Sequence, residues 1–314
     1  MRPKKLVAGL AATTALALPF VFASPAAAAT LPTGDSLYAI TCDDDAEGDL
    51  SASLYSVSPV DAVGTMVGDG TGIIEDCARE AAYNPVTGES FYISYALNSD
   101  ALHKINTTTG VATEVGSWNG DILGIPHVIA IGKDGAAYII DEGELFSLDL
   151  ATANTTLIGD LGVEDIFGFS VDPTSGLFYA TDNTGDAYRI DVAAATATFV
   201  GTVVGGTSLT FSLQIDTSGA WWVEWDNPGD PYTSAIWTGA RPVDGNGSAF
   251  TLVGPLNDIT NEYYPYTQAL LITYPKALAA TGVDATVLVG SAATAALLLL
   301  MGGSVFMLRR RQDA

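Results

Sequence analysis

The sequence predicts an all-β fold, a five-bladed β-propeller whose ring is closed by the C-terminal strand. Three observations predict it. One short motif recurs five times, at spacings of 41 to 54 residues, and each repeat contains four short strand-like segments. The first repeat also lacks a strand that the end of the chain supplies. Repeats of this length, built from short strands and glycine-rich turns, are typical of propeller blades.

The most regular segment is a glycine-containing turn followed by an aromatic residue and apolar β-forming residues. The aromatic residue falls at Tyr38, Tyr92, Tyr138, Tyr179 and Trp222. We expect this segment to be the second strand of each blade. Its predicted ranges are 34–40, 88–94, 135–140, 176–181 and 219–224.

Two further strands follow in every repeat, and another strand connects successive repeats. The third strands are predicted at 54–59, 102–107, 145–150, 187–192 and 236–243. The fourth are predicted at 65–68, 113–116, 155–159, 198–201 and 251–254. Connecting strands such as 167–176 and 211–219 complete the count of four strands in each unit. A β-sandwich or a solenoid is the alternative arrangement.

The two ends of the repeat region complement each other. The first repeat begins almost directly at its second strand, whereas 266–274 is an extra strand after the fifth. We expect 266–274 to complete the first blade, which would leave the ring without a long open edge. The segment Asp172-Pro173-Thr174-Ser175-Gly176 and its counterparts resemble the repeats of bacterial extracellular propellers of the NHL and YVTN-like kind.

The N-terminus has the pattern of a secretory signal peptide. Arg2, Lys4 and Lys5 precede an apolar segment at 6–23, and small residues follow at 27–29. We expect residues 1–29 to form a signal helix that is cleaved between Ala29 and Thr30, and the propeller to occupy residues 30–275.

A second apolar segment, 285–308, lies near the C-terminus and is followed by arginines at 309–311. Its 24 residues would form about 36 Å of helix, enough to cross a hydrocarbon core of about 30 Å. The arginines would stay on the cytoplasmic side. We therefore expect a C-terminal transmembrane helix.

The residues before this segment are Leu278-Ala279-Ala280-Thr281-Gly282. With the apolar segment and the arginines, residues 276–314 resemble the cell-wall sorting signal of Gram-positive surface proteins, in its Leu-Ala-x-Thr-Gly form associated with class E sortases. The resemblance implies recognition of Leu278 and Ala279. It also implies cleavage between Thr281 and Gly282, and transfer of the threonine carbonyl to an amine of the peptidoglycan. Without cleavage, the helix would hold the domain on the cell membrane.

The predicted mature domain is strongly acidic. Residues 30–281 contain 6 Lys and Arg against 34 Asp and Glu, a net charge of −28. Such a domain would repel nucleic acid and attract cations or basic partners. The acidic residues gather in loops that a propeller places on one rim, namely those between second and third strands and those between blades.

Ca²⁺ is the cofactor that this composition suggests, although no calcium-binding consensus is present. The densest candidate ligands are Asp43, Asp45, Glu47 and Asp49. A solvated acidic surface is the alternative. Cys42 and Cys77 are the two cysteines, and export predicts a disulfide between them.

Three residues are candidates for ligand binding. Trp225 and Tyr232 lie in a segment that reads as a loop between the second and third strands of the fifth repeat, where they could stack on a sugar ring. His127 precedes a strand and could approach the central channel. His103 occupies a slot that an aromatic ring fills in the other repeats, so we expect it to pack.

The function that we expect is binding of an extracellular ligand or partner by an exported, wall-anchored surface protein. The alternative is a wall-displayed glycan hydrolase or lyase that uses paired carboxylates. The chain has two histidines and no Gly-x-Ser-x-Gly motif, which favours binding over catalysis.

Overall fold

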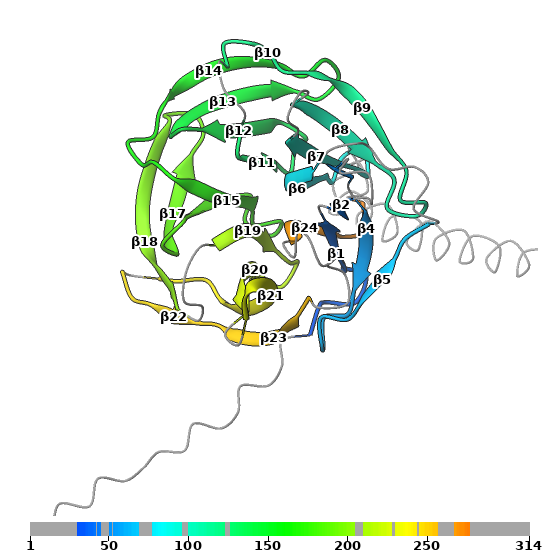
Figure 1. Cartoon of the computed structure of the whole chain (residues 1–314). Helices are drawn as coiled ribbons and strands as arrows, with labels where there is room; N and C mark the ends of the chain where they lie inside the picture. Colours follow the sequence, from blue (N-terminus) through cyan, green and yellow to red (C-terminus); the bar gives the residue numbers. More distant parts are fainter. Residues whose placement is uncertain are drawn as a thin grey trace, which may run out of the picture.

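Five β-sheets surround a central axis (Figure 1). The computed structural model describes residues 30–41, 43–44, 50–51, 53–68, 77–95, 100–122, 126–204, 210–227, 230–243, 245–256 and 267–276. The predicted signal helix and C-terminal apolar helix lie outside these residues. Within the described ranges, no helix is long and apolar enough to span a membrane.

Each blade contains four main antiparallel strands, which follow one another from the axis outward. Blade 1 contains β24 (Thr267–Thr273), β1 (Ser36–Thr41), β4 (Leu54–Val57) and β5 (Gly64–Met66). Blade 2 contains β6 (Cys77–Asn84), β7 (Glu89–Tyr95), β8 (Ala101–Ile105) and β9 (Ala112–Ser117). Blade 3 contains β11 (Val128–Ile131), β12 (Ala137–Asp141), β13 (Glu144–Asp149) and β14 (Asn154–Asp160). Blade 4 contains β15 (Ile166–Val171), β16 (Phe178–Asp182), β17 (Asp186–Asp191) and β18 (Thr196–Val204). Blade 5 contains β19 (Thr210–Ile215), β20 (Ala220–Asn227), β21 (Asp230–Ala240) and β23 (Thr251–Pro255).

The predicted ring closure is confirmed. β24, the last strand of the described chain, pairs antiparallel with β1, the first, from Ser36 opposite Thr273 to Thr41 opposite Thr267. β24 is thus the innermost strand of blade 1, and the blue and orange segments of Figure 1 lie side by side. The protein is a five-bladed β-propeller.

Four short strands were not predicted. β2 (Asp43–Asp44) and β3 (Leu50–Ser51) pair within the first loop between second and third strands. β10 (Asn119–Gly120) adds a parallel strand to β14, and β22 (Ser248–Ala249) adds one to β18. Two-residue strands leave no periodic pattern in a sequence, because they depend on which segment lies beside them.

The hydrophobic core consists of five clusters, one between each pair of neighbouring blades. Aromatic residues of the second strands supply much of it, with Tyr92, Tyr179 and Trp222 at most 1% exposed. Each buried large apolar side chain stabilises the fold by roughly 1.5–3 kcal/mol. The blades therefore hold one another in place, and none has a separate core.

The strand directions define two faces of the ring. The upper face carries the connections from second to third strands and from one blade to the next. The lower face carries the turns from first to second and from third to fourth strands. Both described chain ends lie at the lower face. A Cβ on Gly34 would come within 2.9 Å of Pro275 Cγ, and the backbone N–H of Thr217 donates to Asp35 at 2.9 Å.

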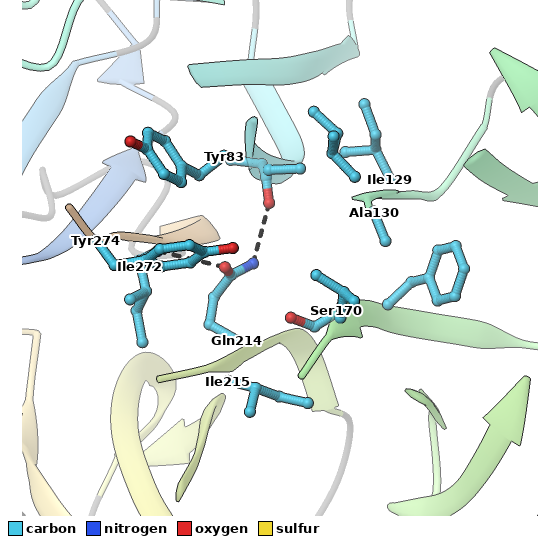
Figure 2. Close-up of a pocket in the computed structure, with 13 residues that line it drawn as sticks. Tyr83, Ile129, Ala130, Ser170, Gln214, Ile215, Ile272 and Tyr274 are labelled. Atoms are coloured by element: carbon cyan, nitrogen blue, oxygen red, sulfur yellow. Dashed lines mark hydrogen bonds between the residues drawn. The ribbon is translucent and has the colours of Figure 1, made fainter. Parts of the chain in front are cut away.

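Side chains of the innermost strands fill the central channel. Toward the lower face they leave a pocket that residues of all five blades line, including Tyr83, Ser170, Gln214 and Tyr274 (Figure 2). Its cavity volume is about 20 Å³, room for about one water molecule. Ligand pockets typically measure roughly 300–1,000 Å³. The channel therefore has no room for a ligand of ordinary size.

Candidate functional site

Five exposed carboxylates lie close together on the upper face, between blades 3 and 4. They are Glu142, Glu144, Asp160, Glu164 and Asp165, which we call the acidic strip. They belong to two segments, the turn from β12 to β13 with the first residue of β13, and the connection from β14 to β15 with the last residue of β14.

Backbone contacts bring these two segments together. Glu144 is directly opposite Asp160 in the ladder between β13 and β14. The N–H of Leu161 donates to the carbonyl of Gly143 at 2.9 Å. A Cβ on Gly143 would lie 2.6 Å from the carbonyl oxygen of Val163, so only glycine permits this approach. The position of the acidic strip is therefore set by the backbone.

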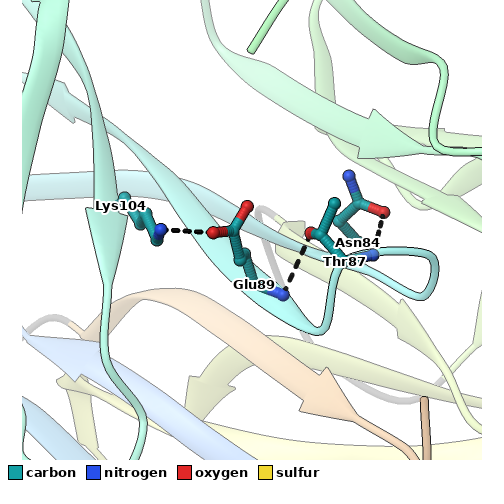
Figure 3. Close-up of polar contacts among 4 residues, drawn as sticks. All are labelled: Asn84, Thr87, Glu89 and Lys104. Carbon is teal, nitrogen blue, oxygen red and sulfur yellow. Dashed lines mark hydrogen bonds and ion pairs between the residues drawn. The ribbon is translucent and has the colours of Figure 1, made fainter. Parts of the chain in front are cut away.

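Acidic residues of the lower face have a different environment. Six aspartates accept backbone N–H groups within their own turns, namely Asp61, Asp134, Asp149, Asp172, Asp191 and Asp216. Asn84 plays the same part in blade 2, where it accepts the N–H of Thr87, and nearby Glu89 pairs with Lys104 (Figure 3). These side chains form the turns that such residues favour.

Four of the five carboxylates of the acidic strip lack such partners within the described ranges. Asp160 accepts the N–H of Gly162 at 2.7 Å, but the side chains of Glu142, Glu144, Glu164 and Asp165 accept no hydrogen bond from a described residue. Local turn geometry therefore explains the six lower-face aspartates and Asp160, and it does not explain the other four carboxylates of the acidic strip.

Basic residues are absent from the described loops of the upper face. Lys104 pairs with Glu89, Lys133 donates to the carbonyl of Thr174 in a lower-face turn, and Lys276 follows β24 at the lower face. Arg241 donates to the hydroxyl of Tyr179 from beyond the lower end of β21. The described loops of the upper face therefore carry acidic residues without basic ones, whereas the lower face carries side chains of both signs.

Three ionisable side chains from the two inner strand layers, Arg79, Asp141 and His127, interact electrostatically with one another or with the inner end of the acidic strip. Arg79 is the extra residue of a β-bulge in β6, where Ala78 and Glu80 face consecutive residues of β7. Asp141 ends β12 and is 7% exposed. His127 precedes β11, and its ring stacks on Phe167 at 5.5 Å between centroids. Bulges commonly redirect side chains near functional sites.

Burial dominates the electrostatics of this group. It raises the pKa of Asp141 to about 6, and Glu142 adds to the increase while Arg79 opposes it. Burial likewise lowers the pKa of His127, with Arg79 lowering it further and Glu142 and Asp165 opposing. Asp141 is therefore a carboxylic acid that changes charge near neutral pH.

The sequence prediction for Trp225 was wrong in its placement. β20 continues to Asn227, so Trp225 lies opposite Ala235 within the ladder and is 4% exposed. Its ring packs against Trp237, at 6.4 Å between centroids, and lies 3.3 Å from where a Cβ on Gly185 would be. Tyr232, which was also predicted to lie in the loop, belongs to strand β21.

The predicted Ca²⁺ site lies mostly outside the described part of the chain. Asp43 is the first residue of β2, but Asp45, Glu47 and Asp49 are not described. Among described residues, no group of three His, Cys, Asp or Glu side chains could hold a metal ion. A Ca²⁺ site in segment 43–49 remains a prediction.

The covalent predictions also remain untested. Cys77 begins β6 and is 2% exposed, whereas Cys42 is not described, so their pairing stays a prediction. The sorting residues Leu278, Ala279, Thr281 and Gly282 and the cleavage residue Ala29 lie outside the described ranges, and Thr30 is the first described residue.

Sequence reasoning identified the acids of the upper face and His127 but missed Arg79 and Phe167. The bulge at Arg79 depends on a mismatch between two strands, which sequence periodicity does not reveal. Phe167 reads as one more apolar strand residue.

No protein-family model matches this chain, and no curated protein matches it significantly. It is similar to a solved chain of a nidogen/laminin complex, with a TM-score of 0.49 and 10% identity over 78% of this chain and 100% of that one. TolB from Acinetobacter baumannii gives 0.43 and 18%, covering 72% of this chain and 54% of that one. A protein of unknown function from Bacteroides thetaiotaomicron gives 0.43 and 15%, covering 64% and 61%. At these TM-scores and identities, the matches carry no argument about function.

Proposed function

We propose that this protein is an exported surface protein whose upper face binds a positively charged extracellular partner. The observation that supports this most directly is the acidic strip, which exposes five carboxylates on a fixed backbone with no described basic loop residue beside them. Such a surface attracts basic groups and increases their rate of association.

The path of the chain supports display of this face. Both described ends, near Thr30 and Lys276, lie at the lower face, opposite the acidic strip. A protein tethered through the residues after Lys276 would therefore present its upper face away from the tether.

For the tether, we propose cleavage between Thr281 and Gly282 by a class E-like sortase and attachment to peptidoglycan. The support is the order of Leu-Ala-Ala-Thr-Gly, apolar segment and arginines in the sequence. In a Gram-positive host, we expect Thr281→Ala to move the protein from the wall fraction to the membrane fraction. An unchanged wall fraction would contradict sortase attachment, yet would leave the binding proposal intact.

The binding proposal is tested with a lysine-rich peptide as the probe. We expect the combined variant Glu142→Gln, Glu144→Gln and Glu164→Gln to weaken its binding about tenfold at low salt, because three exposed ion pairs of roughly 0.2–1 kcal/mol each are lost. Fluorescence anisotropy measures the dissociation constant.

Glu114→Gln on the outer strand β9 is the control, since it removes one exposed charge far from the acidic strip. Glu114→Gln could weaken peptide binding as much as each substitution in the triple variant does on average. That result, or no measurable binding of the peptide by the wild type, would reject the assignment of the binding face.

A second candidate function is acid–base chemistry on a glycan. The observation that favours it is Asp141, whose pKa of about 6 suits proton transfer near neutral pH. A glycan screen for turnover tests it. Activity that Asp141→Asn abolishes would support catalysis, whereas turnover that survives this change would exclude Asp141 as the acid.

A further inference from the structure

A buried polar network crosses the central channel and joins blades 2 and 5. Glu80 of β6 is 0% exposed. Its Oε1 accepts hydrogen bonds from the hydroxyl of Ser212 at 2.6 Å and from Nε2 of Gln214 at 3.3 Å, both in β19. The backbone N–H of Ala81 donates to the same oxygen at 3.3 Å.

The same two side chains of β19 also bind the closing strand. The N–H of Leu270 donates to Ser212 Oγ at 3.1 Å, and the N–H of Ile272 donates to Gln214 Oε1 at 3.3 Å. β24 pairs with β1 along one edge only, so these two donors face the channel. Gln214 Nε2 additionally donates to the carbonyl of Ala81 at 3.0 Å (Figure 2). The network thus satisfies two N–H donors on the inner edge of β24.

The distribution of hydrogen bonds on Glu80 indicates its charge state. Oε1 receives three donors, whereas the equally buried Oε2 has no partner in the described part of the chain. A carboxylate would leave half its charge on Oε2 without a donor or solvent, which is costly. In a neutral carboxyl group Oε2 carries the proton, so the oxygen that has no donor carries no charge. In agreement, burial raises the pKa of Glu80 well above its ordinary value, and the hydrogen bonds from Ser212, Ala81, Gln214 and the backbone of Leu213 lower it less.

Ionisable groups on the surrounding strands do not account for this state. They are Arg79 and Tyr83 on β6, Tyr92 on β7, Tyr38 on β1, Glu224 on β20, Tyr274 beyond β24 and His127 before β11. Burial and hydrogen bonds shift the pKa of Glu80, and no charge among described residues contributes to the shift.

We propose that uncharged Glu80, through Ser212 and Gln214, is a second fastening of the closing strand, and that loss of the Glu80 proton loosens β24. The folded state binds this proton more tightly than the unfolded chain does. The fastening is therefore complete at pH values below the ordinary glutamate pKa and is lost as pH rises through the pKa of folded Glu80. This device is independent of the upper-face site.

The test compares the full-length wild type with Glu80→Gln, which keeps the accepting oxygen but cannot ionise. Between pH 5 and pH 9, we expect the melting temperature of the wild type to fall by about 3 °C or more relative to the variant. Hydrogen exchange of segment 267–273 should be several-fold faster in the wild type at pH 9 and equal in both proteins at pH 5. Exchange of β13, which is remote from the channel, should not differ.

Ser212→Ala provides a second measurement that leaves Glu80 in place. It removes the acceptor of the Leu270 N–H, so exchange of segment 267–273 should rise at both pH values. Parallel pH profiles for the wild type and Glu80→Gln would overturn the proposal. So would unchanged exchange in Ser212→Ala, or faster exchange in β13 and segment 267–273 alike.

Discussion

His103 packs as the aromatic residues of the other repeats do, and it also brings a titratable group into the core. Its ring stacks on Tyr92 at 4.9 Å between centroids, as expected for the repeat position, and Nε2 lies 2.9 Å from Ser94 Oγ. The residue is 1% exposed, and burial lowers its pKa to about 4. The imidazole is therefore neutral over the whole range in which the protein is expected to work.

This burial predicts a contribution to acid sensitivity. Below about pH 6.5 the unfolded chain gains a proton on His103, whereas the folded protein does not until about pH 4. Between pH 7 and pH 4, we expect His103→Phe to gain about 2–3 kcal/mol of unfolding free energy relative to the wild type. Urea unfolding at both pH values measures this difference, and two parallel pH curves would disprove it.

Residues that depend on distant partners were the hardest to predict. Glu80 reads as an ordinary polar strand residue, because Ser212 and Gln214 lie more than 130 positions later in the sequence. Trp225 was assigned to the loop between the second and third strands of the fifth repeat, although both strands continue past it. The exposed acids could be predicted, since each lies in a loop whose position follows from the repeat.

Among the elements, β24 packs on both sides of blade 1. Ala269, Leu270, Leu271 and Ile272 are at most 2% exposed and contribute to the clusters on both sides of blade 1. The repeat pattern predicted this strand, because the first repeat lacks its first strand and an extra strand follows the fifth repeat. In contrast, β10 and β22 follow from contacts of particular loops with outer strands, which no repeat pattern encodes.

Removal of β24 should therefore abolish cooperative folding. A chain that ends at Tyr266 leaves β1 unpaired along its inner edge and opens two core clusters. We expect it to lose its near-ultraviolet circular dichroism signal and its sharp thermal transition. A chain that ends at Lys276 is the control, and a native-like transition in the shorter chain would show that the ring tolerates a first blade without its innermost strand.

At the scale of the whole molecule, negative charge opposes the folded state. A net charge of −28 on residues 30–281 produces self-repulsion that salt screens. Raising NaCl from about 0.05 M to about 0.5 M should increase the melting temperature by about 2–4 °C, which corresponds to about 1 kcal/mol. Differential scanning calorimetry measures the change, and a melting temperature that falls with salt would contradict it.

A comparison of Ca²⁺ with Mg²⁺ distinguishes general screening of the negative charge from binding at a specific site. If segment 43–49 binds Ca²⁺, millimolar CaCl₂ should raise the melting temperature more than MgCl₂ at equal ionic strength, and a chelator should reverse the increase. Equal effects of the two cations would indicate screening alone.

The direction of β24 has a mechanical consequence. This strand runs from the upper to the lower face, and the chain that continues from it leads to the proposed wall attachment. A partner pulling on the acidic strip would stretch β24 along its own axis. The hydrogen bonds between β24 and β1 would then be loaded in shear and would share the force. A strand peeled sideways would break those bonds one after another.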